Sequence, residues 1–114
     1  NRSEEANLYL IASLFGLHPS PTPNGNMGTH LYAYAQSVGD DAATTRRFVQ
    51  LLNLRRETLD SPLRQHVSML KAKEIAVNWH QLLYDLNYWS HASRFVQKNW
   101  AREFWRSPSV QTKP

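Results

Sequence analysis

Apolar residues recur every three to four positions along this chain, and this spacing constrains the fold more than any other feature. Residues three, four and seven positions apart share one face of an α-helix. No segment alternates apolar and polar residues with a period of two, which is the pattern of a half-buried strand. The sequence therefore predicts an all-α fold, a single compact helical bundle of about six helices.

Capping residues and helix breakers divide the first part of the chain. Ser3 is the expected N-cap of the first helix, because Glu4 and Glu5 follow it near the positive end of the helix dipole. The apolar face of this helix is wide, which predicts deep burial of Leu8, Leu10, Ile11, Ala12, Leu14, Phe15 and Leu17. Residues 18–28 hold three prolines and two glycines, and this composition predicts a mobile surface loop.

Five further helices are expected from the same signals. The second covers 29–38 and stops at Gly39, and Asp40 or Asp41 caps the third. Pro62 is expected at the first position of the fourth helix, after Ser61, and Asn78 and Ser90 cap the fifth and the last. The residues expected to face inward are Leu31, Tyr34, Ala35, Val38, Phe48, Leu51, Leu52, Leu63, Val67, Leu70, Trp79, Leu82, Leu83, Leu86, Val96, Trp100 and Phe104.

Length and composition bound the kind of protein. With 114 residues the chain is expected to form one helical domain over 1–106, followed by a flexible tail over 107–114. Because there is no cysteine, disulfides and thiolate metal sites are excluded, and this agrees with a cytoplasmic location. No apolar run approaches the roughly 20 residues of a membrane-spanning helix, so no membrane contact is expected.

Charge is distributed unevenly along the chain. Through Asp41 there are one cation and four anions, whereas the residues from Ala42 onward carry 12 cations and five anions. This asymmetry favours a phosphate-rich partner for the second part, although a solvated basic surface without a partner has the same composition.

The last amphipathic segment, 90–105, concentrates this charge. Arg94, Lys98, Arg102 and Arg106 recur every four residues and would form one basic stripe, opposite the apolar face. Phe95 falls within the stripe and Trp105 at its edge, so these rings either stack on bases or fill a protein interface. Tyr84 and Tyr88 share one helix face, which would suit a subunit contact.

Other basic residues have competing interpretations. Arg46 and Arg47 would contact nucleic acid or pair with Asp40, Asp41 or Glu57. Lys71 and Lys73 close the fourth helix, where the helix dipole favours lysine in any case.

Residues suited to catalysis are sparse. The histidines lie far apart without metal-ligand spacing, and each is expected at the surface or at a helix end: His18, His30, His66, His80 and His91. Asp85 lies between leucines and is expected to face solvent or to be paired. The glycines form no phosphate-binding loop. We therefore expect no enzyme activity, no cofactor and no metal.

Several stretches, in this order, resemble the small subunit of the type I-E CRISPR Cascade complex, the CasB family. They are residues 46–52 (RRFVQLL), 63–67 (LRQHV), 77–79 (VNW), 82–86 (LLYDL) and 96–105 (VQKNWAREFW), with Trp89 and weaker matches at 8–12 and at Met27-Gly28. The resemblance covers nearly the whole chain, and its specificity lies in order and spacing rather than in one motif.

The resemblance implies an all-helical, non-enzymatic subunit. Two copies would lie along a crRNA-guided complex, against its backbone and target-recognition subunits, and hold the displaced non-target DNA strand. Arg56, Arg64 and Arg94 match positions where the family offers basic residues to nucleic acid, and Arg46, Arg47, Lys98 and Arg102 match other basic positions. Two departures stand out: a further N-terminal helical stretch is missing before the first helix, leaving only Arg2 near that junction, and Thr29 replaces a basic residue.

Three other hypotheses remain open. A helical scaffold would join protein subunits without touching nucleic acid, and its basic faces would meet acidic proteins. A freestanding DNA-binding regulator lacks a helix-turn-helix of usual length. An enzyme would have to depend on His80 or Asp85.

Overall fold

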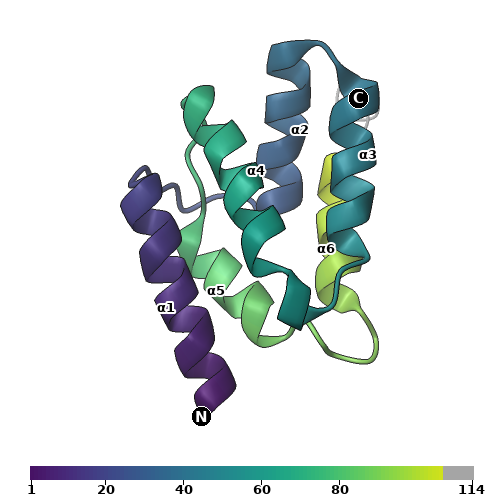
Figure 1. Cartoon of the computed structure of the whole chain (residues 1–114). Helices are drawn as coiled ribbons and strands as arrows, with labels where there is room; N and C mark the ends of the chain where they lie inside the picture. The colour runs from purple at the N-terminus through teal and green to yellow at the C-terminus, as the bar shows by residue number, and fades with distance from the viewer. Residues whose placement is uncertain (107–114) are drawn as a thin grey trace.

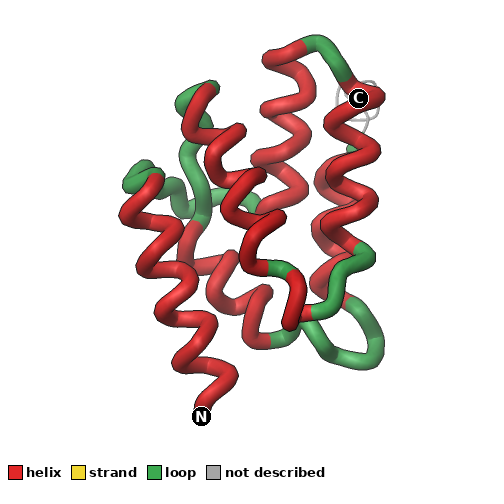
Figure 2. Tube along the Cα trace, viewed as in Figure 1, coloured by secondary structure: helices red, strands yellow, loops and turns green. Residues whose placement is uncertain are grey.

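The computed structural model describes residues 1–106, apart from the side chain of Asp41. Within this range the chain forms six α-helices and one short 3₁₀-helix joined by loops, without a strand, which confirms the all-α prediction (Figure 2). The elements are α1 (Arg2–Leu17), α2 (Met27–Val38), α3 (Asp41–Leu52), η1 (Arg56–Thr58), α4 (Asp60–Ala72), α5 (Trp79–Asn87) and α6 (Phe95–Phe104). The expected flexible tail, 107–114, lies outside the described residues.

The helices form two groups that α4 joins (Figure 1). On one side α1 packs against α5, and on the other α2 packs against both α3 and α6, while α4 contacts α1 and α2. Large aromatic rings fill the space between elements. Phe48 of α3 stacks on Phe104 of α6 with ring centroids 4.1 Å apart, and the rings of Trp89 and Trp100 lie 5.0 Å apart.

Most residues expected to face inward are buried. Tyr34, Val38, Leu52 and Leu83 are only partly buried. The prediction is confirmed for Leu31, Ala35, Phe48, Leu51, Leu63, Val67, Leu70, Trp79, Leu82, Leu86, Val96, Trp100 and Phe104. The helical period therefore located the core of every helix after the first.

The expected deep burial of α1 is wrong. Leu10, Ile11 and Leu14 are buried, but Leu8 is 56% exposed and Phe15 is 40% exposed. α1 lies at the edge of the bundle and packs against α5 and α4 on one side only, so much of its wide apolar face stays exposed.

Two helix starts differ from the prediction. The side chain of Asn1, rather than Ser3, caps α1 by accepting the Glu4 amide hydrogen at 2.9 Å. α4 begins at Asp60, which places Pro62 third instead of first. Proline is tolerated there because the first amide groups of a helix have no intrahelical acceptor.

The segment between α1 and α2 is tied to the rest of the protein. The amide of Val77 donates to the carbonyl of Ser20 at 2.9 Å, and the amide of Thr22 donates to the carbonyl of Val77 at 3.1 Å. α2 begins at Met27, so Gly28, expected in the loop, lies in the helix. Residues 18–26 thus form a non-helical and mostly exposed connection as expected, but the pairing of their backbone with the link between α4 and α5 contradicts the expected mobility.

Gly28 lies where α2 meets α6. A Cβ at this position would overlap the backbone carbonyl of Trp100. Only a glycine therefore allows the two helix backbones to approach this closely.

Three of the histidines expected at the surface or at a helix end are buried, and of these His18 lies at the end of α1. His18 donates from Nε2 to the carbonyl of Ile75 at 2.7 Å, and His30 accepts the amide hydrogen of Asn78 at Nε2 at 3.0 Å. His66 is buried and bonds through Nδ1 to the carbonyl of Pro62 at 2.8 Å. Each ring satisfies a backbone group of a neighbouring segment or of its own helix.

Candidate nucleic-acid interface

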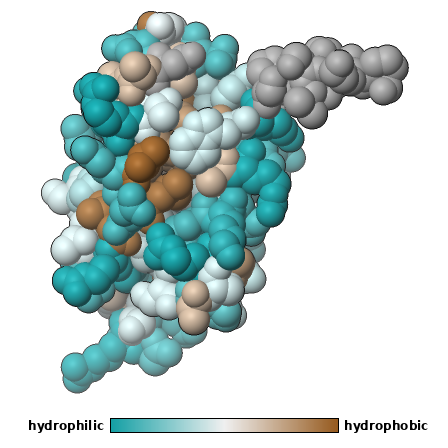
Figure 3. All heavy atoms as spheres, turned by 90° about the vertical axis from the view of Figure 1, so that its right-hand side faces the viewer, coloured by the Kyte–Doolittle hydropathy of each residue, from teal (hydrophilic) through white to brown (hydrophobic). Residues whose placement is uncertain are grey.

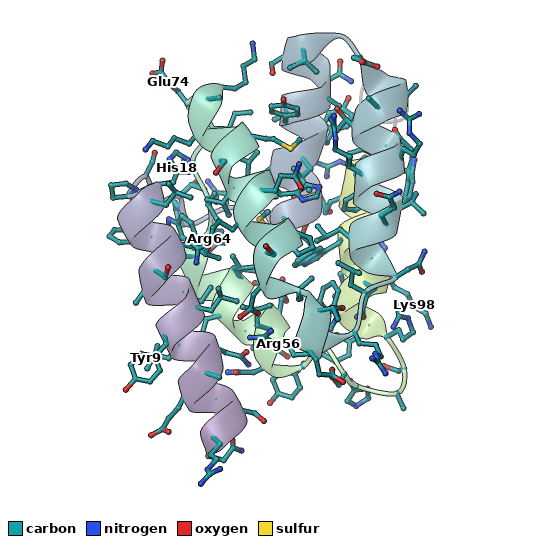
Figure 4. All side chains as sticks on the ribbon, viewed as in Figure 1. Tyr9, His18, Arg56, Arg64, Glu74 and Lys98 are labelled. Carbon is teal, nitrogen blue, oxygen red and sulfur yellow. The ribbon has the colours of Figure 1, made fainter. Side chains whose placement is uncertain are left out.

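The seven basic residues expected to contact nucleic acid do not share one face. Arg56 of η1 and Arg64 of α4 lie on the side of α1, whereas Lys98 extends from α6 on the other side of the molecule (Figure 4). Arg94 lies just before α6. The remaining members are Arg46, Arg47 and Arg102, on α3 and α6.

Arg56 is largely engaged within the protein. Its Nε donates to Oδ1 of Asn7 at 2.7 Å, and its Nη1 forms an ion pair with Oδ1 of Asp60 at 2.6 Å. The side chain is only 20% exposed. Arg56 thus joins η1 to α1 and α4, and three of the five N–H donors of its guanidinium remain for another partner.

Arg64 crosses from α4 to α1 but stays exposed. Its Nη2 donates to Oγ of Ser13 at 3.0 Å. A hydroxyl does not neutralise the guanidinium, so Arg64 keeps its full charge at the surface.

Arg94 is not the first helical residue of a stripe. It adopts the left-handed conformation, with φ of 57°, and serves as the N-cap position of α6. Its Nη2 donates to the backbone carbonyl of Leu52 at 2.7 Å, at the end of α3. The expected cap at Ser90 is wrong, because the chain turns through 90–94 before α6 begins at Phe95.

Arg46 and Arg47 are exposed on α3. Neither forms an ion pair with Asp40 or Glu57, and the carboxylate of Asp40 instead accepts the amide hydrogen of Ala43 at 3.2 Å. Arg47 and the buried His66 line the same pocket between α3 and α4. Burial lowers the pKa of His66 below its ordinary value, the hydrogen bond to Pro62 opposes this, and the charge of Arg47 lowers the pKa further.

The shortened basic stripe consists of Lys98 and Arg102 on the outer face of α6 and of Arg106, two residues beyond the end of this helix. Lys98 and Arg102 are exposed, and neither pairs with a carboxylate of the described part of the chain. Arg102 donates from Nη1 to Oδ1 of Asn99 at 2.9 Å. Arg106 is 3.5 Å from Oε1 of Glu103, so its charge is partly balanced.

A polar pocket of about 610 Å³ adjoins this stripe. Arg102 and Glu103 line it from α6, Arg106 lines it from just beyond the end of α6, and Gln81 lines it from α5. The other lining residues are Asn24, Gly25, Asn26, Thr29 and Asn99. Two arginines among amide and hydroxyl groups form a surface suited to an oxyanion such as phosphate.

Sequence reasoning overlooked the polar residues at the start of α2. Asn26 and Thr29 form a capping box: the Asn26 side chain accepts the Thr29 amide hydrogen at 3.1 Å, and Oγ1 of Thr29 accepts the Asn26 amide hydrogen at 3.1 Å. The spacing of a capping asparagine three residues before a hydroxyl residue was the available signal. Thr29, where a basic residue was expected, thus has a structural role here.

The face formed by α3 and α6 combines polar and apolar surface. Figure 3 shows a small apolar patch surrounded by hydrophilic residues on this side of the molecule. Trp105 is half exposed and meets the ring of Phe48 edge-on, with centroids 5.4 Å apart. The choice between base stacking and a protein contact therefore stays open for Trp105.

Asp85 is buried between α5 and α6. Its Oδ2 accepts the indole N–H of Trp100 at 2.7 Å, and its Oδ1 accepts the Gln81 amide at 2.9 Å. Burial raises the pKa of the Asp85 carboxyl, while the hydrogen bonds from Trp100 and then Gln81 lower it in part. Of the two expectations for this residue, pairing is confirmed and exposure to solvent is wrong.

Residues 1–106 offer neither a metal cluster nor a membrane span. Within this range, no group of three or more histidine, aspartate or glutamate side chains is placed to hold a metal ion. No helix there combines the length and the apolar character required to cross a membrane.

Comparisons with known proteins give a consistent result. Residues 1–105 match the family described as CRISPR-associated protein Cse2. A CRISPR-associated protein Cse2 from Thermus thermophilus is 32% identical over 97 residues, which cover 85% of this chain and 54% of that protein. The chain therefore spans about half the length of this relative.

Solved structures share the fold. A Cse2-family protein from Thermus thermophilus superposes with a TM-score of 0.82 and 31% identity, over 92% of this chain and 64% of the other. CasB from M. ruber superposes with a TM-score of 0.85 and 25% identity, over 97% of this chain and 69% of the other.

Proposed function

Because the chain belongs to the family of CRISPR-associated protein Cse2, we propose that it is a non-catalytic small subunit of a crRNA-guided Cascade complex. In this role its basic faces hold the displaced non-target DNA strand and stabilise the R-loop in the cytoplasm. Its partners are crRNA, target and non-target DNA, a second copy of itself, and the backbone and target-recognition subunits. Since strand exchange is nearly balanced in free energy, a few contacts to the DNA backbone suffice to shift it.

The exposed cations on α6 carry this proposal. Lys98 and Arg102 lie one helical turn apart, and no described carboxylate neutralises them. Contacts of this kind to phosphate carry no sequence information, which suits a complex whose specificity comes from base pairing. Arg46 and Arg47 add two more exposed cations on α3.

The arginines that bond within the chain have a different part in the same proposal. Arg64 and Arg94 each use one N–H donor internally, and Arg56 uses two. Each guanidinium has five, so three donors of Arg56 and four each of Arg64 and Arg94 remain for phosphate. We assign these three residues a combined role in positioning helices and contacting phosphate.

The groups with shifted pKa support a non-catalytic role. His30 and Asp85 are buried and hydrogen-bonded to neighbours in the bundle, whereas His66 is buried, bonds to the carbonyl of Pro62 in its own helix and lines the pocket between α3 and α4. Shifted pKa values of this kind follow from core packing alone.

The test uses the reconstituted complex with a target that forms an R-loop. The variant R46A/R47A/K98A/R102A removes four exposed cations, and we expect the displaced strand to dissociate and re-anneal faster. The control K71A/K73A removes two cations from the end of α4, outside the proposed interface. An R-loop as long-lived with the quadruple variant as with the parent protein would contradict the proposal.

A protein scaffold is the second candidate, and the outer face of α1 favours it. Leu8, Tyr9 and Phe15 are all exposed on this helix. Exposed apolar residues gathered on one helix are typical of a protein contact. If L8S/F15S prevents assembly while the quadruple cation variant keeps full R-loop stability, the chain is a scaffold without direct nucleic-acid contact.

A further inference from the structure

Three aromatic rings form a continuous row where α5 leads into α6, two of them exposed and the third, Phe95, partly buried against the core. The ring centroids of Tyr84 and Tyr88 are 4.8 Å apart, and those of Tyr88 and Phe95 are 5.9 Å apart. His91 meets Phe95 edge-on at 5.2 Å and supports it from the connecting loop. We call Tyr84, Tyr88 and Phe95 the aromatic row.

The two tyrosines are not needed to fill the core. Tyr84 is 47% exposed and Tyr88 is 45% exposed. Neither hydroxyl forms a hydrogen bond with another residue of the described range, although a buried tyrosine usually finds a partner. Their ring surface and hydroxyls are therefore available to a ligand.

The aromatic row continues directly into the basic stripe. Lys98 follows Phe95 by three residues on α6 and Arg102 follows Lys98 by four, so all three share one helix face. On α5, Gln81 precedes Tyr84 by three residues and lines the polar pocket together with Arg102. Rings and cations thus lie on adjacent faces of two neighbouring helices.

A buried hydrogen bond links the two helices beneath these faces. Asp85, on α5, accepts hydrogen bonds from Trp100 on α6 and from Gln81 on the outer side.

The one carboxylate in the polar pocket, Glu103, is already engaged by Arg106 and by the hydroxyl of Thr29 at 3.3 Å. A polyanion would therefore meet uncompensated positive charge at Lys98 and Arg102.

We propose that the aromatic row stacks on unpaired bases of a single nucleic-acid strand whose phosphates follow Lys98 and Arg102. Every base has a π-face, so stacking holds a strand of any sequence, and a groove of cations follows its backbone. Duplex DNA keeps its bases stacked inside and cannot use the aromatic row. This inference rests on the proposed function and gives it a chemical basis, namely selectivity for an unpaired strand.

Charge favours this occupant over a protein. A protein interface usually has few charged residues at its centre, whereas here the rings run straight into exposed cations. An acidic protein would fit the cations, but it would not require flat rings beside them. A protein partner is therefore the competing outcome of the test.

The experiment compares two ligands of equal charge, oligothymidylate and an abasic strand of the same length, bound to the full chain. Stacking contributes roughly 1–3 kcal/mol per base, so we expect at least a roughly fivefold preference for oligothymidylate per stacked ring. Y84A/Y88A should lose this preference and keep the salt dependence of binding. K98A/R102A should keep the preference, bind both strands more weakly and show a shallower salt dependence.

Two controls separate stacking from other effects. Y84F/Y88F retains the rings and should retain the preference, and Tyr9→Ala removes a more exposed tyrosine from α1 without effect. Equal binding of both strands by the parent protein would overturn the inference, while weaker binding by K98A/R102A would still support the proposed function.

Two further results would also test the inference about the aromatic row. Failure of Y84A/Y88A to join the protein subunits when no nucleic acid is present would identify the row as a protein interface and overturn the inference. If the parent chain bound neither strand at low salt, the inference would be contradicted, whereas the proposed function would still be tested by the lifetime of the R-loop in the reconstituted complex.

Discussion

The indole N–H of Trp100 donates a 2.7 Å hydrogen bond to the carboxylate of Asp85, and both side chains are buried. This bond joins α6 to α5 beneath the surface that carries the aromatic row and the basic stripe. A buried carboxylate is tolerated only while its hydrogen-bond donors stay in place. Losing either donor would leave one carboxylate oxygen buried and unsatisfied.

Asp85→Ala should destabilise the fold through this bond. The substitution leaves the buried indole N–H of Trp100 without an acceptor, which costs roughly 1–3 kcal/mol in the free energy of unfolding. Asp85→Asn keeps one acceptor and should lose less. Urea titrations at neutral pH measure the difference, and equal losses in the two variants would show that the hydrogen bond is not the cause.

The pH dependence of the same pair has a defined sign. Burial raises the folded-state pKa of Asp85 above its ordinary value of 3.8, so the folded state holds this proton more tightly than the unfolded state. The stabilisation is complete below the unfolded-state pKa and is lost as the pH rises through the folded-state pKa. Between these two pKa values we expect the free energy of unfolding of the parent protein to fall relative to that of Asp85→Asn. A difference in free energy of unfolding that does not change with pH would contradict this prediction.

His30 should give the opposite dependence at higher pH. Burial lowers its pKa from 6.5 to about 4, so between these two pH values the unfolded state binds a proton at His30 and the folded state does not. The stabilisation is complete above pH 6.5 and is lost as the pH falls toward 4, by up to about 3 kcal/mol at 1.36 kcal/mol per pKa unit. Unfolding free energies of the parent and His30→Gln at pH 7.5 and 4.5 test this. The variant should lose less on acidification.

Gly28→Ala should separate α2 from α6. The added methyl group would overlap the carbonyl of Trp100, so we expect a loss of several kcal/mol, on the order of other severe overpacking changes. Gly16→Ala is the matched control, because no atom lies near its added Cβ on α1 and alanine favours a helix by about 0.5–1 kcal/mol. Thermal unfolding of both variants should show shifts of opposite sign.

Arg94 combines a strained backbone with a side chain that hydrogen-bonds to the end of α3. Arg94→Ala loses the bond to the carbonyl of Leu52 and keeps a side chain in the left-handed region. Arg94→Gly loses the same bond but relieves the strain, which amounts to roughly 1–2 kcal/mol. The glycine variant should therefore unfold at a higher urea concentration than the alanine variant. The reverse order would mean that the backbone conformation of Arg94 is unstrained.

Periodicity and capping predicted most of the fold. The helical period located the inward residues of α2 through α6, and Asp40, Asn78 and Gly39 end or begin helices as expected. These signals are local, because a cap or a breaker acts within one helical turn. The order and spacing of short motifs along the sequence also predicted the resemblance to the CasB family. The similarity of the whole bundle to Cse2 structures confirms this resemblance.

The remaining features depend on contacts between distant segments. The burial of His30, which was expected at the surface or at a helix end, could not be predicted because the residue that it accepts from, Asn78, lies 48 positions away. Arg94 was expected to begin a helical stripe but lies just before α6. Its side chain bonds instead to the carbonyl of Leu52, 42 positions earlier, and a contact over this distance leaves no local signal in the sequence. The position of the aromatic row beside the basic stripe likewise follows from how α5 packs near α6. The contacts of the seven basic residues with nucleic acid remain a prediction.

The pairing of Ser20 and Thr22 with Val77 has a practical consequence for labelling this protein. Exposed loops are the usual sites for inserted tags or fluorophores. The connection between α1 and α2 is bonded to the link before α5, so an insertion there would disturb both segments. The turn at Gly39 is a better choice, since no atom crowds that position and it lies between two capped helices. A probe placed just after Gly39 would report on assembly without disturbing the bundle.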